Sequence, residues 1–150
     1  MEITPASSQD IAQIRTLLHA NGLPLDGFPD DCAVILALKN PERVVGGSAL
    51  EIHSEFGLLR SVIVDASVRG VGLGERLVSA ALIEAGARGL ERVFLLSETA
   101  AGFFPRFGFQ SIARQQVPAA VRSSVEFRSA CPETAQVMVL ELTESGTESP

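Results

Sequence analysis

The chain has 150 residues, 46% of them apolar, which suits one domain with a buried core. Its 18 acidic and 12 basic residues give a formal charge of −6, which argues against a nucleic-acid partner, because such proteins present a basic face. No apolar run reaches membrane-spanning length and no targeting leader is visible, so we expect a cytoplasmic protein without membrane contact. Its two cysteines, Cys32 and Cys131, lack metal-site spacing and are too few for a disulfide framework, so we expect no metal.

The first half of the chain predicts a strand, a helix and an antiparallel meander. A capping box at Ser7–Asp10 precedes apolar residues at helical spacing, and Asn21-Gly22 ends that helix. Residues 23–31 hold two prolines and three aspartates and predict a loop. Alternating or apolar runs bounded by turn residues predict strands at Glu2–Pro5, Ala33–Leu38, Val44–His53 and Gly57–Asp65.

The second half alternates helices and strands. The predicted helices run from Gly72 to near Gly89, over Thr99–Arg106, and from Pro118 to about Ala130. The predicted strands are Arg92–Ser97, Phe109–Val117 and Ala135–Leu142. This order predicts a mixed α/β sheet in a single domain over residues 1–142, followed by a frayed polar tail over 143–150.

The most informative stretch is Arg69-Gly70-Val71-Gly72-Leu73-Gly74, between the fourth predicted strand and a helix. Three alternate glycines there leave a row of backbone N–H groups unobstructed at the positive end of a helix dipole, which suits a pyrophosphate. One glycine alone would be explained by a tight turn. The alternation of three favours a phosphorylated cofactor.

Of two common phosphate-binding folds, one is excluded for this loop and the other is disfavoured. A nucleotide triphosphatase loop ends in Gly-Lys-Ser/Thr, whereas this one ends Gly74-Glu75-Arg76. A dinucleotide-binding loop follows the first strand, with an acid closing a second strand about twenty residues on. Here the loop follows the fourth strand, and Glu91 begins a strand rather than ending one.

Two ordered motifs identify a family. Arg69-x-x-Gly72-x-Gly74 after an antiparallel pair resembles the acyl-CoA signature of the GNAT superfamily of N-acetyltransferases. Downstream, Phe103-Phe104-Pro105-Arg106-Phe107-Gly108-Phe109 resembles the family's F-Y-x-x-x-G-F segment. The resemblance spans about Gly46 to Val117 and implies acetyl-CoA as cosubstrate. It also implies an α/β fold with a mixed, mostly antiparallel sheet of six to seven strands and helices on both faces.

The resemblance assigns contacts to the cofactor. Backbone groups of Val62, Ile63 and Val64, on a strand that splays from its neighbour, would pair with the pantetheine arm as an added strand does. The N–H groups of Arg69 through Gly74 would hold the pyrophosphate. Phe104 would pack against the pantetheine arm. Arg106 would contact a phosphate, or would be an ordinary exposed helix arginine.

Acetyl transfer to an amine needs a base, a donor to the oxyanion and a proton for the thiolate. The family implies a backbone N–H of Val62 or a neighbour as the oxyanion donor, and a tyrosine as the acid. That tyrosine is Phe104 here, and the chain has no tyrosine. The stretch around Ser97 resembles the acetyltransferase domain of N-acetylglutamate synthases, in which this position is the proposed acid. Ser97 therefore replaces the tyrosine, or it caps the following helix.

Glu51 is the predicted base, directly or through water, although a solvated strand carboxylate is the alternative reading. His53 and Glu98 are the further candidates. The synthase's proposed base carboxylate aligns with Leu58, so that group is missing here.

Arginines are the candidate acceptor-binding residues. Arg60 lies in an apolar strand, where it would receive a substrate carboxylate or form an ion pair with Glu51. Arg122 and Arg128 follow Pro118 and would close over the site, or belong to an ordinary amphipathic helix.

The stretches 59–62 and 126–132 also resemble a small bacterial subgroup associated with arsenic resistance and labelled amino-acid acetyltransferases. Together these features predict direct acetyl transfer from acetyl-CoA to a small amino-acid-like amine. Two alternatives stay open: a CoA-binding sensor without catalysis, and acetylation of protein amino termini or lysines. Many relatives pair through their last strands, which implies a homodimer.

Overall fold

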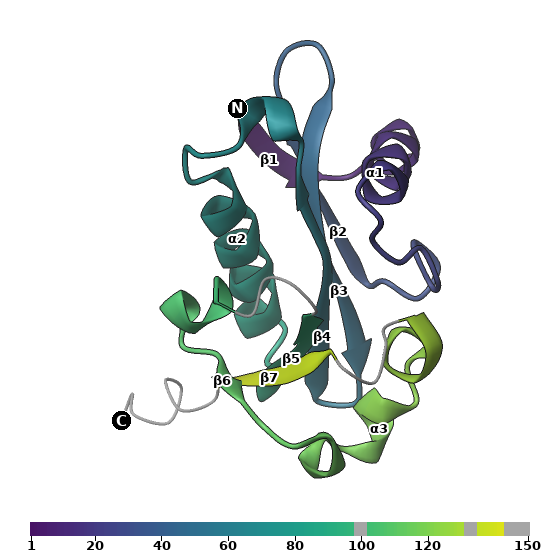
Figure 1. Cartoon of the computed structure of the whole chain (residues 1–150), viewed down its shortest axis with the longest axis vertical. Helices are drawn as coiled ribbons and strands as arrows, with labels where there is room; N and C mark the ends of the chain where they lie inside the picture. Colours follow the sequence, from purple (N-terminus) through teal and green to yellow (C-terminus); the bar gives the residue numbers. More distant parts are fainter. Residues whose placement is uncertain (98–101, 131–134, 143–150) are drawn as a thin grey trace.

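The computed structural model describes residues 1–97, 102–130 and 135–142. One seven-stranded sheet runs through the molecule in the order β1-β2-β3-β4-β5-β7-β6 (Figure 1). Every neighbouring pair is antiparallel except β4 and β5, which are parallel, so the mixed, mostly antiparallel sheet is confirmed. The strands are β1 Glu2–Pro5, β2 Val34–Lys39, β3 Val44–His53, β4 Phe56–Val64, β5 Arg92–Ser97, β6 Gln110–Ser111 and β7 Gln136–Glu141.

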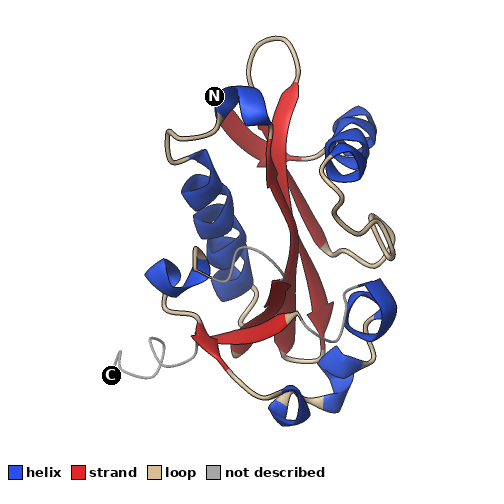
Figure 2. Ribbon diagram, in the orientation of Figure 1, coloured by secondary structure: helices blue, strands red, loops and turns tan. Residues whose placement is uncertain are grey.

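The two long helices lie on opposite sides of the sheet (Figure 2). Helix α1, Ser8–Ala20, begins at the predicted capping box, in which Ser7 and Asp10 exchange hydrogen bonds of 3.0 and 3.1 Å. It buries Ile14 and Leu18 against β2, β3 and β4. Helix α2, Leu73–Ala87, packs residues such as Val78 against the other face. No helix in the described part of the chain is long and apolar enough to cross a membrane.

Strand β4 is open along half of its length. It pairs with β5 only from Phe56 to Leu58, and residues 59–64 have no registered partner on that side. On its other side, the register with β3 passes from Ile63–Gly47 to Arg60–Ala49, so Ser61 and Val62 oppose Ser48 alone. This is a β-bulge, and Ser61 adopts a φ of +59° within it.

The bulge decides where the side chains of β4 point. Ile63 joins the cluster beneath α1, whereas Val62 packs against the cluster beneath α2. A regular strand would alternate and would place Arg60 and Val62 on one face. With the extra residue, Arg60 shares the α1 side with Ile63, and the other face stays apolar.

The chain after β5 differs from the prediction. The strand predicted for Phe109–Val117 is only β6, Gln110–Ser111, and a 3₁₀ turn at Arg114–Gln116 follows, closed by the Gln116 side chain accepting from the Ala113 N–H at 3.3 Å. Of the helix predicted for Thr99–Arg106, the described part is a 3₁₀ turn, Phe104–Phe107, and residues 98–101 lie outside the described ranges. The polar tail predicted for 143–150 lies outside them too.

The helix predicted from Pro118 to Ala130 is broken. It divides into α3, Ala119–Arg122, and a π-helical turn, Glu126–Ala130. The break falls at Ser123 and Ser124, whose hydroxyls bond elsewhere: Ser123 to the Ala120 carbonyl at 2.8 Å and Ser124 to the Glu51 carboxylate at 2.8 Å. Serine hydroxyls compete with helical hydrogen bonds, and here a tertiary partner decides the competition.

Close packing of β3 against β4 can be tested with a glycine pair. A Cβ at Gly46 would lie 2.7 Å from the Ile63 carbonyl, so we expect Gly46→Ala to lower the free energy of unfolding by about 1–3 kcal/mol. The control is Gly86→Ala, at an exposed helical position with no atom within 4 Å of the new Cβ, which should raise it by about 0.5–1 kcal/mol. Urea unfolding of both variants measures the difference, and equal effects would contradict the packing argument.

Candidate functional site

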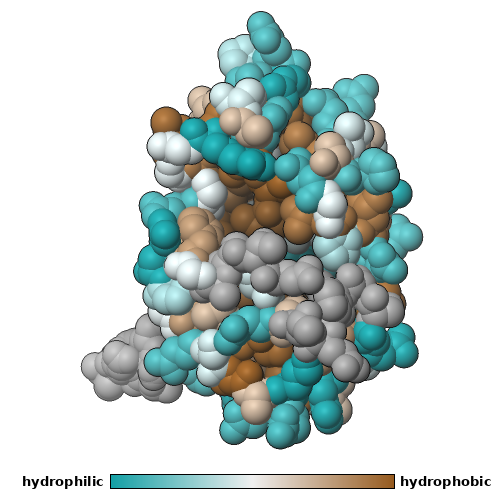
Figure 3. Space-filling view, in the orientation of Figure 1, coloured by the Kyte–Doolittle hydropathy of each residue, from teal (hydrophilic) through white to brown (hydrophobic). Residues whose placement is uncertain are grey.

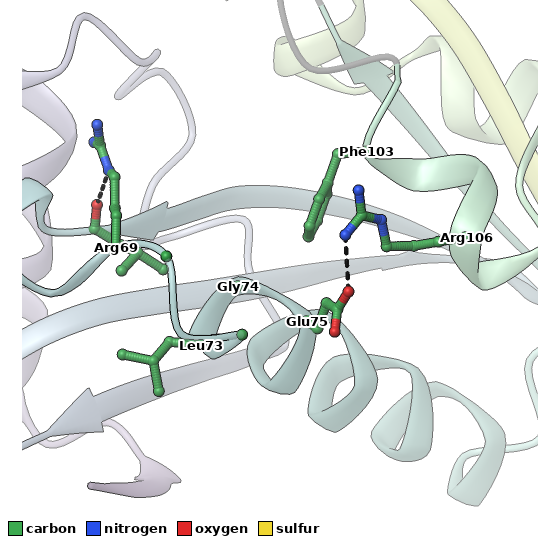
Figure 4. Close-up of a pocket in the computed structure, with 9 residues that line it drawn as sticks. Arg69, Leu73, Gly74, Glu75, Phe103 and Arg106 are labelled. Atoms are coloured by element: carbon green, nitrogen blue, oxygen red, sulfur yellow. Dashed lines mark hydrogen bonds and ion pairs between the residues drawn. The ribbon is translucent and has the colours of Figure 1, made fainter.

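The glycine loop lines a pocket of about 510 Å³. Figure 4 shows the start of α2 below it, with Phe103 and Arg106 facing that helix from the far side. The residues that line it come from the end of β4, the loop, the first turn of α2 and the segment after β5: Val64, Arg69, Gly70, Gly72, Leu73, Gly74, Glu75, Phe103 and Arg106. Seven of the residues predicted to bind the cofactor therefore line one cavity: Val64, Arg69, Gly70, Gly72, Leu73, Gly74 and Arg106.

The backbone of the loop is shaped for an anion. Gly70 and Gly72 have φ values of +93° and +79°, and Gly72 is the N-cap of α2. None of the N–H groups of residues 70–75 has an acceptor among the described residues. Unpaired N–H groups at the start of a helix form an anion site. Val71 is the one residue between Arg69 and Gly74 that does not line the pocket, and it is 71% exposed.

The two arginines of the pocket have different surroundings. Arg69 donates from Nε to the Val64 carbonyl at 2.8 Å and from Nη2 to Asn21 Oδ1 at 3.0 Å, so it ties the loop to the end of β4. Arg106 forms a half-exposed ion pair with Glu75 at 2.8 Å and lies over the Phe103 ring at 4.6 Å. Figure 4 shows the Arg69 guanidinium turned away from the pocket, whereas the Arg106 guanidinium lies beside Phe103 and Glu75 at the pocket's edge.

The splayed edge of β4 leads away from this pocket. Val64 lines the pocket, and the backbone of Val62 and Ile63 lies along the unpaired part of the strand. Figure 3 shows a hollow with an apolar floor between the α2 side and the α1 side of the molecule. This edge offers N–H and C=O groups for an added extended chain.

Phe103 and Phe104 have different surroundings: Phe103 lines the pocket and Phe104 packs in the core. Phe104 is buried and packs against Phe109, with ring centroids 5.9 Å apart, and it does not line the pocket. Phe103 lines the pocket instead, 3.4 Å from where a Cβ at Gly74 would stand. The sequence motif singled out Phe104, and only the packing distinguishes the two rings. Ser97 is the last residue of β5, opposite Gln136, and is 9% exposed.

A second constellation lies on the α1 side of β4. The Arg60 guanidinium sits between two carboxylates, with Nη1 2.9 Å from Glu51 Oε2 and Nε 3.1 Å from Glu126 Oε1. Glu51 Oε1 also accepts from the Ser124 hydroxyl at 2.8 Å and contacts His53 Nε2 at 2.6 Å. We call these five residues, from β3, β4 and the segment after α3, the buried charge cluster.

The cluster changes how two predicted residues are understood. The Arg60 side chain is 0% exposed and has the Glu51 ion pair that the sequence allowed as an alternative to binding a substrate carboxylate. Glu51 is also 0% exposed, and its two oxygens hold three partners, so direct proton transfer would need one partner to leave. Their roles in the reaction stay predictions.

Other predicted residues stand apart from the cluster. Arg122 and Arg128 are exposed, and Glu98 and Cys131 lie outside the described residues. Glu126 and Ser124 are the members that sequence reasoning missed. The available signal was Glu126 itself, a carboxylate between Val125 and Phe127 in a stretch predicted as an amphipathic helix.

Burial controls the ionisation of the cluster. Loss of solvent raises the pKa of Glu126 to about 7, opposed by the Arg60 charge and assisted by Glu51 and Asp26. Burial likewise raises the pKa of the neighbouring Cys32 thiol to about 12, so this thiol stays protonated. Within the described ranges, no group of three His, Cys, Asp or Glu side chains could hold a metal ion.

Comparison with known proteins gives concordant matches. The family model described as an acetyltransferase (GNAT) domain matches residues 30–111. The chain is 33% identical over 122 residues to glucosamine 6-phosphate N-acetyltransferase of Trypanosoma brucei brucei, covering 76% of this chain and 78% of the relative. It is 41% identical over 81 residues to an amino-acid acetyltransferase of Mycobacterium tuberculosis, covering 53% of this chain but only 45% of that relative.

Solved structures agree with these matches. Rv2747 from Mycobacterium tuberculosis, in complex with CoA and NLQ, superposes with a TM-score of 0.79 at 25% identity, covering 95% of this chain and 99% of that one. N-acetylglutamate synthase from Neisseria gonorrhoeae, complexed with coenzyme A and N-acetyl-glutamate, gives 0.78 at 23% identity, covering 94% of this chain and 35% of the synthase. The second likeness concerns the fold alone.

The raised pKa of Glu126 predicts a pH dependence of stability. Between the unfolded pKa of 4.5 and the folded value of about 7, the folded chain holds a proton that the unfolded chain has lost. Stability from this group is therefore complete below about pH 4.5 and falls, by up to about 3 kcal/mol, as the pH rises to about 7.

We expect Glu126→Gln to remove that fall, measured by urea unfolding across the same pH range. The control is Glu84→Gln, since Glu84 is 41% exposed and its pair with Arg88 lies on the surface. A wild-type and a Glu126→Gln protein with the same pH dependence would contradict the assignment.

Proposed function

Because the chain belongs to the GNAT family of acetyltransferases, we propose that it transfers the acetyl group of acetyl-CoA to the amine of a small amino-acid-like acceptor by direct attack. The observation that carries this proposal is the alignment of two open backbone surfaces. The unpaired edge of β4 runs into the loop whose N–H groups have no acceptor among the described residues. Together they suit an extended amide-bearing arm that ends in a pyrophosphate, as in acetyl-CoA.

A small acceptor is favoured because other segments of the chain cover Arg60 on the α1 side of β4. The loop after α1 lies over Arg60, since the Pro24 carbonyl is 3.4 Å from Nη2 and a Cβ at Gly27 would lie 3.2 Å from Nη1. Glu126 covers it from the other side. A protein substrate needs an open groove for its chain, whereas this enclosure suits a small molecule. The 41% identical relative named amino-acid acetyltransferase points to the same class.

An amino-sugar phosphate is the second candidate acceptor. The relative that aligns over the larger share of the chain is named glucosamine 6-phosphate N-acetyltransferase. Both acceptors carry an amine and an anionic group on a small framework. They differ in where the anion stands relative to the amine, so the acceptor itself has to be tested.

The bulge supplies a donor for the oxyanion. Ser61 and Val62 stand against one residue of β3, which turns backbone groups out of the regular ladder within the splayed part of β4. We assign the oxyanion contact to the N–H of Val62 or its neighbour. A donor held rigidly at that place stabilises the tetrahedral intermediate more than it stabilises the planar thioester.

The CoA thiolate can leave without a strong general acid, so the absence of the family's tyrosine does not rule out the reaction. A thiol of the cysteine type has a pKa of about 8.5, so its anion is a tolerable leaving group near neutral pH. Ser97, at the end of β5 beside the splay, is the proposed proton donor. Phe104 supports Phe103 from the core instead of donating, with ring centroids 5.2 Å apart.

The proposed function is tested by release of free CoA thiol from acetyl-CoA with a panel of acceptors. The panel holds the twenty amino acids, their carboxamides, glucosamine 6-phosphate and a short peptide with a free amino terminus. We expect turnover with one or more amino acids and little with the peptide. A preference for glucosamine 6-phosphate would show that the acceptor is an amino-sugar phosphate and not an amino acid. Tight binding of acetyl-CoA without turnover on any amine would favour a CoA-binding sensor without catalysis.

The pocket makes a separate prediction about acetyl-CoA. Gly72 lines the pocket at a φ of +79°, and a Cβ there would meet no protein atom within 4 Å, so it would occupy space that the cofactor needs. We expect Gly72→Ala to weaken acetyl-CoA binding at least about tenfold, an effect of about 1.4 kcal/mol.

The matched control is Gly89→Ala, just past the other end of α2. Gly89 has a φ of +73° and equal free space, but it lies outside the pocket. Both variants should lose about 1–2 kcal/mol of stability from the left-handed backbone. Calorimetric titration with acetyl-CoA should separate them, and similar affinities in the two variants would argue against this pocket as the cofactor site.

A further inference from the structure

We propose that Glu126 receives the ammonium group of the acceptor and takes a proton from it before the amine attacks the acetyl group. The inference rests on the proposed acetyl transfer. It assigns to Glu126 the role of general base that the sequence predicts for Glu51, and it gives Glu51 the role of holding Arg60 in place.

The position of Glu126 is the first argument. Its Oε1 lies 3.1 Å from Arg60 Nε, and the same nitrogen donates to the Ser61 hydroxyl at 3.1 Å. Ser61 belongs to the bulge, so the Glu126 carboxylate stands next to the part of β4 that is assigned to the thioester. Glu51 lies opposite Leu58, where β4 is still paired with β5.

Solvent exposure also favours Glu126 over Glu51 as the group that meets the acceptor. The Glu51 side chain is 0% exposed, whereas that of Glu126 is 5% exposed. Both Glu51 oxygens have partners within the cluster. Glu126 is therefore the carboxylate of the pair that lies nearer to solvent.

Charge balance is the third argument. With both carboxylates ionised, the single Arg60 guanidinium leaves one negative charge uncompensated in a buried place, which is unfavourable. An incoming ammonium group would neutralise that charge, whereas an incoming carboxylate would double it. The cluster therefore suits the cationic end of the acceptor.

The groups around Glu126 support this assignment. Asp26 adds negative potential, and the Cys32 thiol is neutral because its pKa is raised to about 12. His53 contacts Glu51 Oε1, the carboxylate oxygen that does not face Arg60. From the neighbouring 3₁₀ turn, Arg114 lies over the Phe127 ring at 5.2 Å.

Glu126 sits on a segment that can adjust to a ligand. It opens a π-helical turn of five residues that follows an α-helix of four. Such short elements have few internal hydrogen bonds, and π-helical turns occur frequently at functional sites. The segment is held by the contacts of Ser124 and Glu126 with the sheet and by the buried Phe127.

The proton balance of the step is complete. One proton of the ammonium group passes to the Glu126 carboxylate, and the freed nitrogen lone pair forms the C–N bond. Collapse of the tetrahedral intermediate breaks the C–S bond, and the second nitrogen proton ends on the departing sulfur. The products are the amide and the CoA thiol, and Glu126 returns its proton to solvent. A carboxyl with a pKa of about 7 suits this exchange near neutral pH.

The test compares Glu126→Gln with Glu51→Gln, using the amino acid that the wild-type protein acetylates fastest. In Glu126→Gln the side-chain amide keeps an oxygen for Arg60 and loses the charge. We expect kcat to fall about 100-fold or more while the KM for acetyl-CoA is unchanged, and the acidic limb of the kcat/KM profile between about pH 5 and about pH 9 to disappear. Glu51→Gln should keep that limb.

Several outcomes would overturn the assignment. These are wild-type turnover in Glu126→Gln, a wild-type profile with no acidic limb, or loss of the limb in Glu51→Gln or His53→Gln alone. Should Glu126→Gln fail to fold, Glu126→Asp keeps the carboxylate and should show a slower reaction with the limb retained. A wild-type protein that acetylates no amine would instead refute the proposed function, so the two failures are distinguishable.

Discussion

The separation of β4 from β5 after Leu58 is the constraint on which the rest of the structure depends. Two strands that part within a sheet leave unsatisfied backbone groups along one edge, which is costly unless a partner covers them. The bulge at Ser61 and Val62 adds a residue within the separated part of β4 and places Ser61 in a left-handed conformation. An extended ligand that adds to the sheet would satisfy these groups.

The ends of that edge are fixed by independent contacts. At one end, Arg69 joins the glycine loop to the Val64 carbonyl, so the N–H groups at the start of α2 continue the line of the strand. At the other end, Arg60 joins β4 to Glu51 on β3 and to Glu126 near the C-terminus. The open edge of β4 and the glycine loop thus present backbone groups, and the α1 side of β4 presents buried charge.

The buried charge has a cost that bears on function. A well-packed apolar cluster of similar volume would often be at least as stable as a buried ion pair, so the presence of three charged groups is weak evidence for stability. Held at a fixed place beside the bulge, such groups suit the proposed recognition of an acceptor's own charge. This distinguishes the cluster from the exposed pair Arg92–Glu141, which contributes little at the surface.

Sequence pattern was sufficient to predict those elements whose structure depends on interactions between residues close together in the chain. The capping box at Ser7, the apolar faces of α1 and α2 and the mostly apolar run of β3 all determine structure within a few residues. Pattern failed between Pro118 and Ala130, where the run predicts one helix. The hydroxyl of Ser124 bonds to Glu51, 73 positions away, and a contact of that range has no local signature.

The sequence by itself indicated a phosphorylated cofactor, because alternate glycines between a strand and a helix leave N–H groups unobstructed, and the resemblance of two ordered motifs to a known family narrowed it to acetyl-CoA. It also placed Arg60 among apolar residues, where a charge needs a partner. Only the tertiary structure decided which partners these are. The bulge turns Arg60 toward the α1 side, and the broken helix brings Glu126 to it from the far end of the chain. The physical reason is distance: backbone conformation is encoded locally, whereas the pairing of buried charges depends on how remote segments pack together.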